Sequence, residues 1–145
     1  MIFSLWNGVK GKEGHIADPR LDQIYKSIAD ACQSDNCVIL TLMDGEFGED
    51  TLSVSAQSGN IHVTSFRNLP NDNDEVISLN NPNWEAESMR GLFYQEYPKL
   101  GKVPMVEIGG NYWDARSVTT DIEVVKTIFK EFFETGKISH LWMRQ

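Results

Sequence analysis

Residues 37–63 read CVILTLMDGEFGEDTLSVSAQSGNIHV, and this stretch decides the class of the fold. Residues 37–43 are continuously apolar and rich in β-branched side chains, which is typical of a central strand covered on both faces. After a polar loop, apolar and polar residues alternate over 52–56 and again over 61–63, with a serine–glycine pair between the two runs. Two alternating runs joined by a short glycine turn predict an antiparallel hairpin.

Two amphipathic helices are expected, one on each side of this hairpin in the sequence. Asp18 and Pro19 predict the start of the first, because aspartate is a good cap and proline fits the first helical position; its apolar stripe runs to Cys32. In the second, residues 120–123 match a capping box and Gly136 ends the helix. The apolar stripes of both helices predict packing against a sheet.

The other segments complete an α+β fold. They are expected to be a turn-rich loop over 68–75, a short strand over 76–79, a short helix from Asn83 toward Phe93, a hairpin of 103–108 and 112–118 around two glycines, and a final strand over 138–143. No repeat, linker or composition shift divides the chain. We therefore expect one α+β domain over residues 1–145, an antiparallel β-sheet with two main packed α-helices.

Length and charge restrict the function. A chain of 145 residues can bury a sizeable core without metals or disulfides. Its formal net charge of -8 argues against nucleic acid as a direct ligand, because phosphates require a Lys/Arg surface. The apolar start over 1–6 is too short for a signal peptide, and no run reaches the length of a membrane span. We expect a cytoplasmic protein that does not bind membranes, with Cys32 and Cys37 reduced.

The sequence carries no catalytic motif that we can identify. His15, His62 and His140 lack metal-ligand spacing, and solvated or edge-strand positions are expected for the two that fall in predicted strands, His62 and His140. The acidic loops suggest calcium but lack EF-hand spacing, and pairs of carboxylates occur by chance in so acidic a chain. The hypothesis is therefore a non-enzymatic protein without a cofactor or a metal site.

The charge is segregated along the chain. Residues 44–96 carry ten acidic and two basic residues, whereas the other 92 residues carry eleven of each. An acidic patch is expected, either as a solvated surface that promotes solubility or as a docking face for a basic partner. Phe47 and Trp84 lie among these acids and suit interface anchors, with core burial as the alternative. The predicted partner-binding residues are Asp44, Glu46, Phe47, Glu49, Asp50, Asp72, Asp74, Glu75, Trp84, Glu85 and Glu87.

The C-terminal third carries a family resemblance. Its motifs are Gly109-Gly110-Asn111-Tyr112-Trp113, then Arg116-Ser117-Val118, then Phe129-Lys130-Glu131-Phe132-Phe133-Glu134-Thr135-Gly136-Lys137, then Leu141-Trp142. This pattern, over about 35 residues, resembles the ending of a family of small bacterial immunity proteins. Genes of that family lie beside polymorphic and contact-dependent growth-inhibition toxins.

The resemblance implies a cytoplasmic, non-enzymatic protein that binds and blocks one cognate toxin C-terminal domain, often a nuclease. Nucleases tend to be basic at the substrate face, so an acidic inhibitor would mimic the phosphate backbone and exclude the substrate. The leading hypothesis is an immunity protein that neutralises its toxin by stoichiometric binding. A non-enzymatic accessory or binding subunit of another bacterial system is the alternative, and a small enzyme is the third. The sequence leaves the oligomeric state open.

Overall fold

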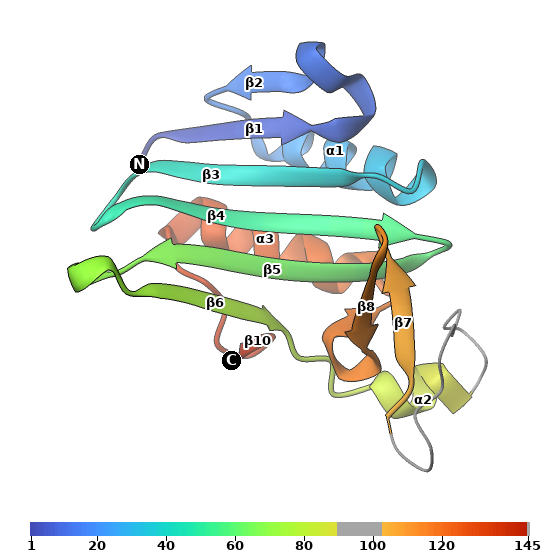
Figure 1. Cartoon of the computed structure of the whole chain (residues 1–145). Coiled ribbons are helices and arrows are strands. Elements are labelled where there is room, and N and C mark those ends of the chain that lie inside the picture. Colours follow the sequence, from blue (N-terminus) through green and yellow to red (C-terminus); the bar gives the residue numbers. More distant parts are fainter. Residues whose placement is uncertain (90–102, 145) are drawn as a thin grey trace.

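An antiparallel sheet organises the protein, as a computed structural model that describes residues 1–89 and 103–144 shows (Figure 1). The strands of this sheet are β1 (Phe3–Asn7), β2 (His15–Ala17), β3 (Cys37–Gly45), β4 (Gly48–Gln57), β5 (Asn60–Asn68), β6 (Asp74–Leu79), β9 (Val118–Thr119) and β10 (Met143–Arg144). Their order is β10-β6-β5-β4-β3-β1-β2, and β9 pairs with the first residues of β5. The predicted β4–β5 hairpin and the short strand before residue 80 are confirmed.

Two helices cover one face of the sheet. α1 (Leu21–Gln33) and α3 (Ile122–Thr135) both lie behind it in Figure 1. Leu40 and Leu52 from the central strands and Phe129 and Phe132 from α3 are fully buried in the main core. Burying each such side chain contributes on the order of 2 kcal/mol, so these contacts fix the helices to the sheet. The α+β class with two main packed helices is confirmed.

The expectation that both faces of β3 are covered is wrong. Val38, Leu40 and Leu42 are buried beneath the helices, but Ile39 is only half-buried and Met43 is exposed. Strand side chains alternate between faces, so these two sets lie on opposite sides. The sequence looks continuously apolar because the open side also carries apolar residues.

The second hairpin covers one end of this open side. β7 (Met105–Ile108) and β8 (Asn111–Asp114) are joined by Gly109 and Gly110, whose φ angles of 61° and 83° favour glycine. Val106 and Ile108 are buried in a second, smaller cluster. The predicted strand over 112–118 is broken, because the Asp114 carboxylate accepts a hydrogen bond from the Arg116 backbone N–H at 2.9 Å and starts a 3-10 turn, Ala115–Ser117.

The first helix begins later than predicted. Asp18 has a φ of 46° and donates its backbone N–H to the Phe3 carbonyl at 3.0 Å, so it belongs to the connection after β2 and does not cap α1. Arg20 is the N-cap residue. Its backbone N–H donates to Gln23 Oε1 at 2.9 Å, which is one half of a capping box.

The predicted capping box of α3 is also wrong. Asp121 is the N-cap residue, and its carboxylate accepts from the Glu123 N–H at 3.0 Å. The Thr120 hydroxyl is not available for capping, since it donates to Glu87, 33 residues earlier, at 2.8 Å. Gly136 ends the helix in the left-handed conformation, as predicted.

Two further predictions are met only in part. The final strand is limited to β10, because the Met143 N–H donates to the Ser139 carbonyl and the chain turns between these residues. A short helix does follow Asn83: α2 spans Trp84–Met89. Its predicted continuation through Leu92 and Phe93 lies outside the described residues.

Candidate functional site

The predicted partner-binding residues fall at two opposite ends of the sheet. One end combines the β3–β4 turn with the β5–β6 connection, and we call residues 44–50 and 66–75 the acidic end. The other end carries α2, beside β9 (Figure 1). The acidic end holds seven acidic residues and one basic residue, so most of the segregated charge does gather in one place.

The surface of the acidic end is built by two neighbouring hairpins. Glu46, Phe47 and Glu49 are exposed at the β3–β4 turn, and the Phe47 side chain is 44% exposed. Asp74 is exposed at the start of β6. Asn68 joins the two hairpins, because its side-chain amide donates to the Glu49 carbonyl at 3.0 Å while its backbone pairs with Asp74. Asn68 thus places Glu49 and Asp74 on neighbouring strands, at the end of the sheet where Glu46 and Phe47 are also exposed.

Two more of the predicted partner-binding residues, Asp44 and Asp72, lie at the acidic end. Asp44 is exposed, and its carboxylate accepts the Ile2 backbone N–H at 2.7 Å, which holds the β3 end against the chain start. Asp72 belongs to the 3-10 turn Pro70–Asp72 at the same end, and its side chain lies outside the described residues.

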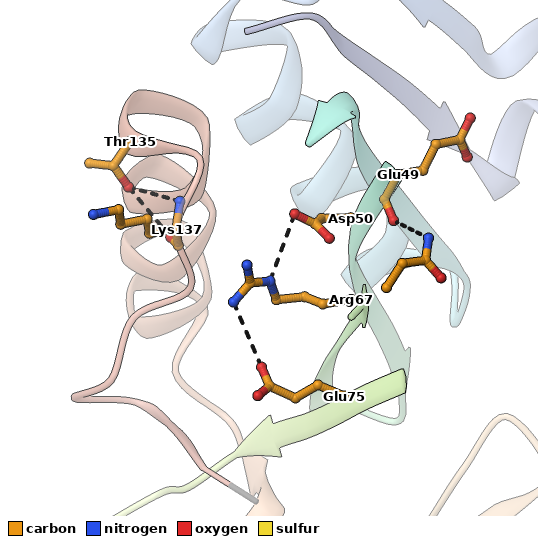
Figure 2. A network of polar contacts seen from close by, with 7 residues as sticks. Glu49, Asp50, Arg67, Glu75, Thr135 and Lys137 are labelled. Carbon is orange, nitrogen blue, oxygen red and sulfur yellow. Dashed lines mark hydrogen bonds and ion pairs between the residues drawn. The ribbon is translucent and has the colours of Figure 1, made fainter. Parts of the chain in front are cut away.

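Asp50 does not belong to this surface, contrary to the prediction. Alternation along β4 places it on the helix-covered face, where it is 4% exposed (Figure 2). Arg67 Nε lies 3.7 Å from Asp50 Oδ2, and Arg67 Nη1 lies 3.9 Å from Glu75 Oε1. Burial raises the pKa of Asp50, and the Arg67 charge opposes this rise. Arg67, the one base of the acidic end, is thus turned inward between two carboxylates, and Glu75 is only half-exposed.

The opposite end carries the remaining predicted residues. Glu85 is exposed on α2, whereas Trp84 is half-buried and packs against the cluster of Val106 and Ile108. Trp84 therefore matches the alternative, core packing, more closely than an exposed interface anchor. Glu87 is 6% exposed, so the prediction of a surface contact is wrong for this residue as well.

Glu87 fastens α2 to the segment before α3. One carboxylate oxygen accepts from the Thr119 hydroxyl at 3.2 Å, from the Thr120 N–H at 3.1 Å and from the Thr120 hydroxyl at 2.8 Å. The other accepts from the Asn81 side-chain amide, which also donates to the Val118 carbonyl at 2.8 Å. Hydrogen-bonded donors stabilise a buried carboxylate, so Glu87 and these partners form a clasp.

A polar cleft of about 400 Å³ opens beside the clasp. Glu87, Thr120, Asp121 and Asn83 contribute polar groups to its walls. Most of these groups are already engaged, since Glu87 accepts four hydrogen bonds and Asp121 caps α3. Within residues 1–89 and 103–144, no three His, Cys, Asp or Glu side chains lie close enough together to hold a metal ion.

His62 is buried, so the expectation of a solvated or edge-strand histidine is wrong for it. The ring is 3% exposed and stacks on Trp113 with 3.8 Å between centroids. Nδ1 lies 2.8 Å from the Ser117 carbonyl, to which it donates, and the Thr64 hydroxyl lies 2.6 Å from Nε2. Burial lowers the pKa of His62 to about 4, so the ring is neutral. His140 is exposed in the turn before β10, outside a strand.

One serine–histidine pair is exposed. Ser4 Oγ and His15 Nε2 lie 2.6 Å apart on β1 and β2. An activated serine also needs a group that orients the histidine and donors for an oxyanion. Among the residues the structure describes, no side chain is hydrogen-bonded to Nδ1 of His15. The pair alone does not make a catalytic centre.

The two cysteines are free, as expected. Both are half-buried, one at the end of α1 and one at the start of β3. Burial raises the pKa of Cys32 to about 11 and also raises that of Cys37. Neither side chain has the low pKa of a reactive thiol.

Comparisons with known proteins support the fold and leave the activity undefined. A family of unknown function, DUF6911, matches residues 97–141, the segment that includes the second hairpin and α3. A crystal structure of a hypothetical protein from Neisseria gonorrhoeae is similar over 96% of this chain and 90% of that chain, with a TM-score of 0.56 and 15% sequence identity. Among curated proteins, none matches this sequence. At that identity the likeness shows a shared fold.

Within the described residues, no helix is long and apolar enough to cross a membrane.

Sequence reasoning missed two features. The clasp was missed, because its partners are far apart in the sequence. The apolar residues on the open side of the sheet were missed too, although the phase of alternation from Asp50 to Ala56 already separates the two faces.

Proposed function

We propose that this chain is an immunity protein that binds a basic toxin domain, for example a nuclease, and blocks it by stoichiometric binding in the cytoplasm. One observation supports this most: exposed carboxylates from two neighbouring hairpins lie at the same end of the sheet as exposed Phe47, while Arg67 is turned inward. The C-terminal resemblance to immunity proteins supports the same role independently. The role proposed is binding, without catalysis, cofactor or metal.

The physical reasoning rests on charge and anchoring. Outward carboxylates attract a basic surface over a distance of about one screening length and speed correct encounters. An aromatic side chain among them supplies the apolar contact that most often dominates binding energy. An acidic surface that covers the substrate site of a nuclease also excludes the phosphate backbone.

Growth of cells tests the proposal directly. The C-terminal domain of the gene immediately upstream in the native locus is expressed alone and together with this chain. We expect growth arrest that only co-expression cures. If the upstream domain is harmless, or is toxic and not neutralised, the immunity proposal is overturned in favour of an accessory subunit with a non-toxic basic partner.

Charge reversal tests the surface. Glu46, Glu49 and Asp74 are replaced together by lysine, and a control variant replaces the exposed Glu13, Glu85 and Glu131 by lysine. Both variants change the net charge equally, but only the first changes the acidic end. We expect the first to weaken binding of the purified upstream domain by about tenfold to a hundredfold and the control by less than about threefold. Equal effects would contradict the acidic end as the contact surface.

A further inference from the structure

Within residues 1–89 and 103–144, the sheet face opposite α1 and α3 is left open over β1, β3, β4, β5 and β6. Both helices lie behind the sheet, and the β7–β8 hairpin covers only the end beside the β4–β5 turn (Figure 1). Two rows of paired residues lie at the centre of this open face. Over β1 to β6, one row is Trp6, Ile39, Ser53, Thr64 and Ser78, and the next is Ser4, Thr41, Thr51, Phe66 and Val76. The first row ends beside Arg144 of β10, which is exposed.

These rows are uncharged and accessible. Phe66 is 38% exposed and Val76 is 55% exposed, while the other eight residues of the two rows are half-buried. Met43, also exposed, lies on the same side of β3. Large apolar side chains gathered on one exposed sheet face are unusual for a monomer surface and mark interaction sites.

The open face continues directly into the acidic end. Strand alternation places Glu49, Asn68 and Asp74 on the same side as Phe66 and Val76, one row further along. The backbone pairing of Asn68 with Asp74 and of Phe66 with Val76 fixes this neighbourhood. The row that carries Phe66 and Val76 therefore borders the acidic row of Glu49, Asn68 and Asp74, with no basic residue in either.

We infer that the open face is the surface that binds the toxin domain, with Phe66 and Val76 as apolar anchors and the acidic row as its charged border. This inference rests on the proposed function and names where the partner sits. The matching partner surface is a protein patch of uncharged and apolar side chains, bordered on one side by lysine and arginine. An apolar centre with a charged rim is the common anatomy of such interfaces.

Other occupants fit this surface less well. A second copy of the chain would bring another molecule of net charge -8 to a face that already has an acidic border. Strand addition at the part of the β6 edge that β10 leaves unpaired would place the new strand beside Asp74 and Glu75, and charged residues at a sheet edge oppose such pairing.

Threonine substitutions test the inference while preserving strand propensity. Phe66→Thr and Val76→Thr are combined, and the control combines Val9→Thr and Leu141→Thr, which replace exposed apolar residues away from the open face. Affinity for the purified upstream domain is measured by calorimetry, and thermal unfolding verifies that each variant is folded. We expect at least about tenfold weaker binding for the first pair and less than about twofold change for the control.

The outcomes separate this inference from the proposed function. If charge reversal at the acidic end weakens binding and the Phe66/Val76 variant does not, the open face is not the binding surface. The inference is then overturned, while the immunity proposal stands. If the wild-type chain does not bind the upstream domain, the proposed function falls and the inference falls with it. A dimer on a sizing column that the Phe66/Val76 variant dissociates would assign the face to a second copy and overturn the inference.

Discussion

At the scale of single residues, His62 shows how burial decides protonation. The ring lies between Trp113 and the strand, donates to the Ser117 carbonyl and accepts from the Thr64 hydroxyl, and this arrangement requires one proton on the ring. A second proton would have to displace the Thr64 hydrogen bond in a desolvated site. The folded protein therefore resists protonation that the unfolded chain accepts.

His62 is predicted to make the protein acid-sensitive. Its pKa falls from 6.5 to about 4 on folding, so its contribution is fully present above pH 6.5 and is lost as the pH falls through 4. Urea unfolding at pH 7 and pH 4.5 is compared for wild type and His62→Gln. We expect the variant to lose less stability between these pH values, by about 2 to 3 kcal/mol. The exposed His140→Gln control should keep the wild-type pH dependence; if His62→Gln does too, the ring is not held neutral.

Residue positions were predictable where the local pattern defines them. The phase of β4, in which Leu52 and Val54 are buried, also buries Asp50 two residues earlier. Counting charges without this phase placed Asp50 on the surface. Glu87 could not be placed in this way, because its burial depends on donors from residues 119 and 120, more than thirty positions away.

At the scale of elements, α2 depends on its clasp. It spans only Trp84–Met89, too short to be stable alone, so its position is set by tertiary contacts. The main anchors are the Glu87 hydrogen bonds to the segment before α3 and the packing of Trp84 on the second cluster. Loss of one anchor should loosen this helix before it affects the sheet.

The substitution Glu87→Gln tests the clasp. The amide keeps the shape but replaces one accepting oxygen with a donor, which leaves buried donors without an acceptor. We expect a loss of about 1 to 3 kcal/mol in the free energy of unfolding and faster amide hydrogen exchange over residues 84–89. Glu85→Gln removes the same charge from an exposed site on the same helix and should change neither. Similar effects of both variants would show that charge, and not the clasp, is responsible.

Elements were predicted well where their signals are local. Alternation and turn glycines identified both hairpins, and the apolar periodicity identified α1 and α3. The last strand is shorter than predicted because of a local turn between Ser139 and Met143. The starts of both helices were predicted poorly, because Thr120 and Asp18 hydrogen-bond to distant parts of the chain. Contacts of this kind are set by the assembled fold and leave no pattern within a short window of sequence.

At the scale of the whole molecule, the open sheet face and the acidic end adjoin each other. The helices cover the back of the sheet, and the open face leads into the acidic end without an intervening base (Figure 1). Electrostatic attraction acts before contact, whereas apolar packing acts after it. The two parts of the proposed surface should therefore control different steps of binding.

This division gives a kinetic prediction for the upstream toxin domain. Raising the salt concentration from about 10 mM to about 150 mM shortens the screening length from about 30 Å to about 8 Å, so the association rate of the wild-type chain should fall steeply. The lysine variant of Glu46, Glu49 and Asp74 should start slower and show little dependence on salt. The Phe66→Thr and Val76→Thr variant should keep the wild-type salt dependence and dissociate about tenfold faster, because its lost contacts form only in the bound complex. Stopped-flow association and surface-binding dissociation measurements separate these rates, and a salt-independent wild-type association rate would contradict electrostatic steering by the acidic end.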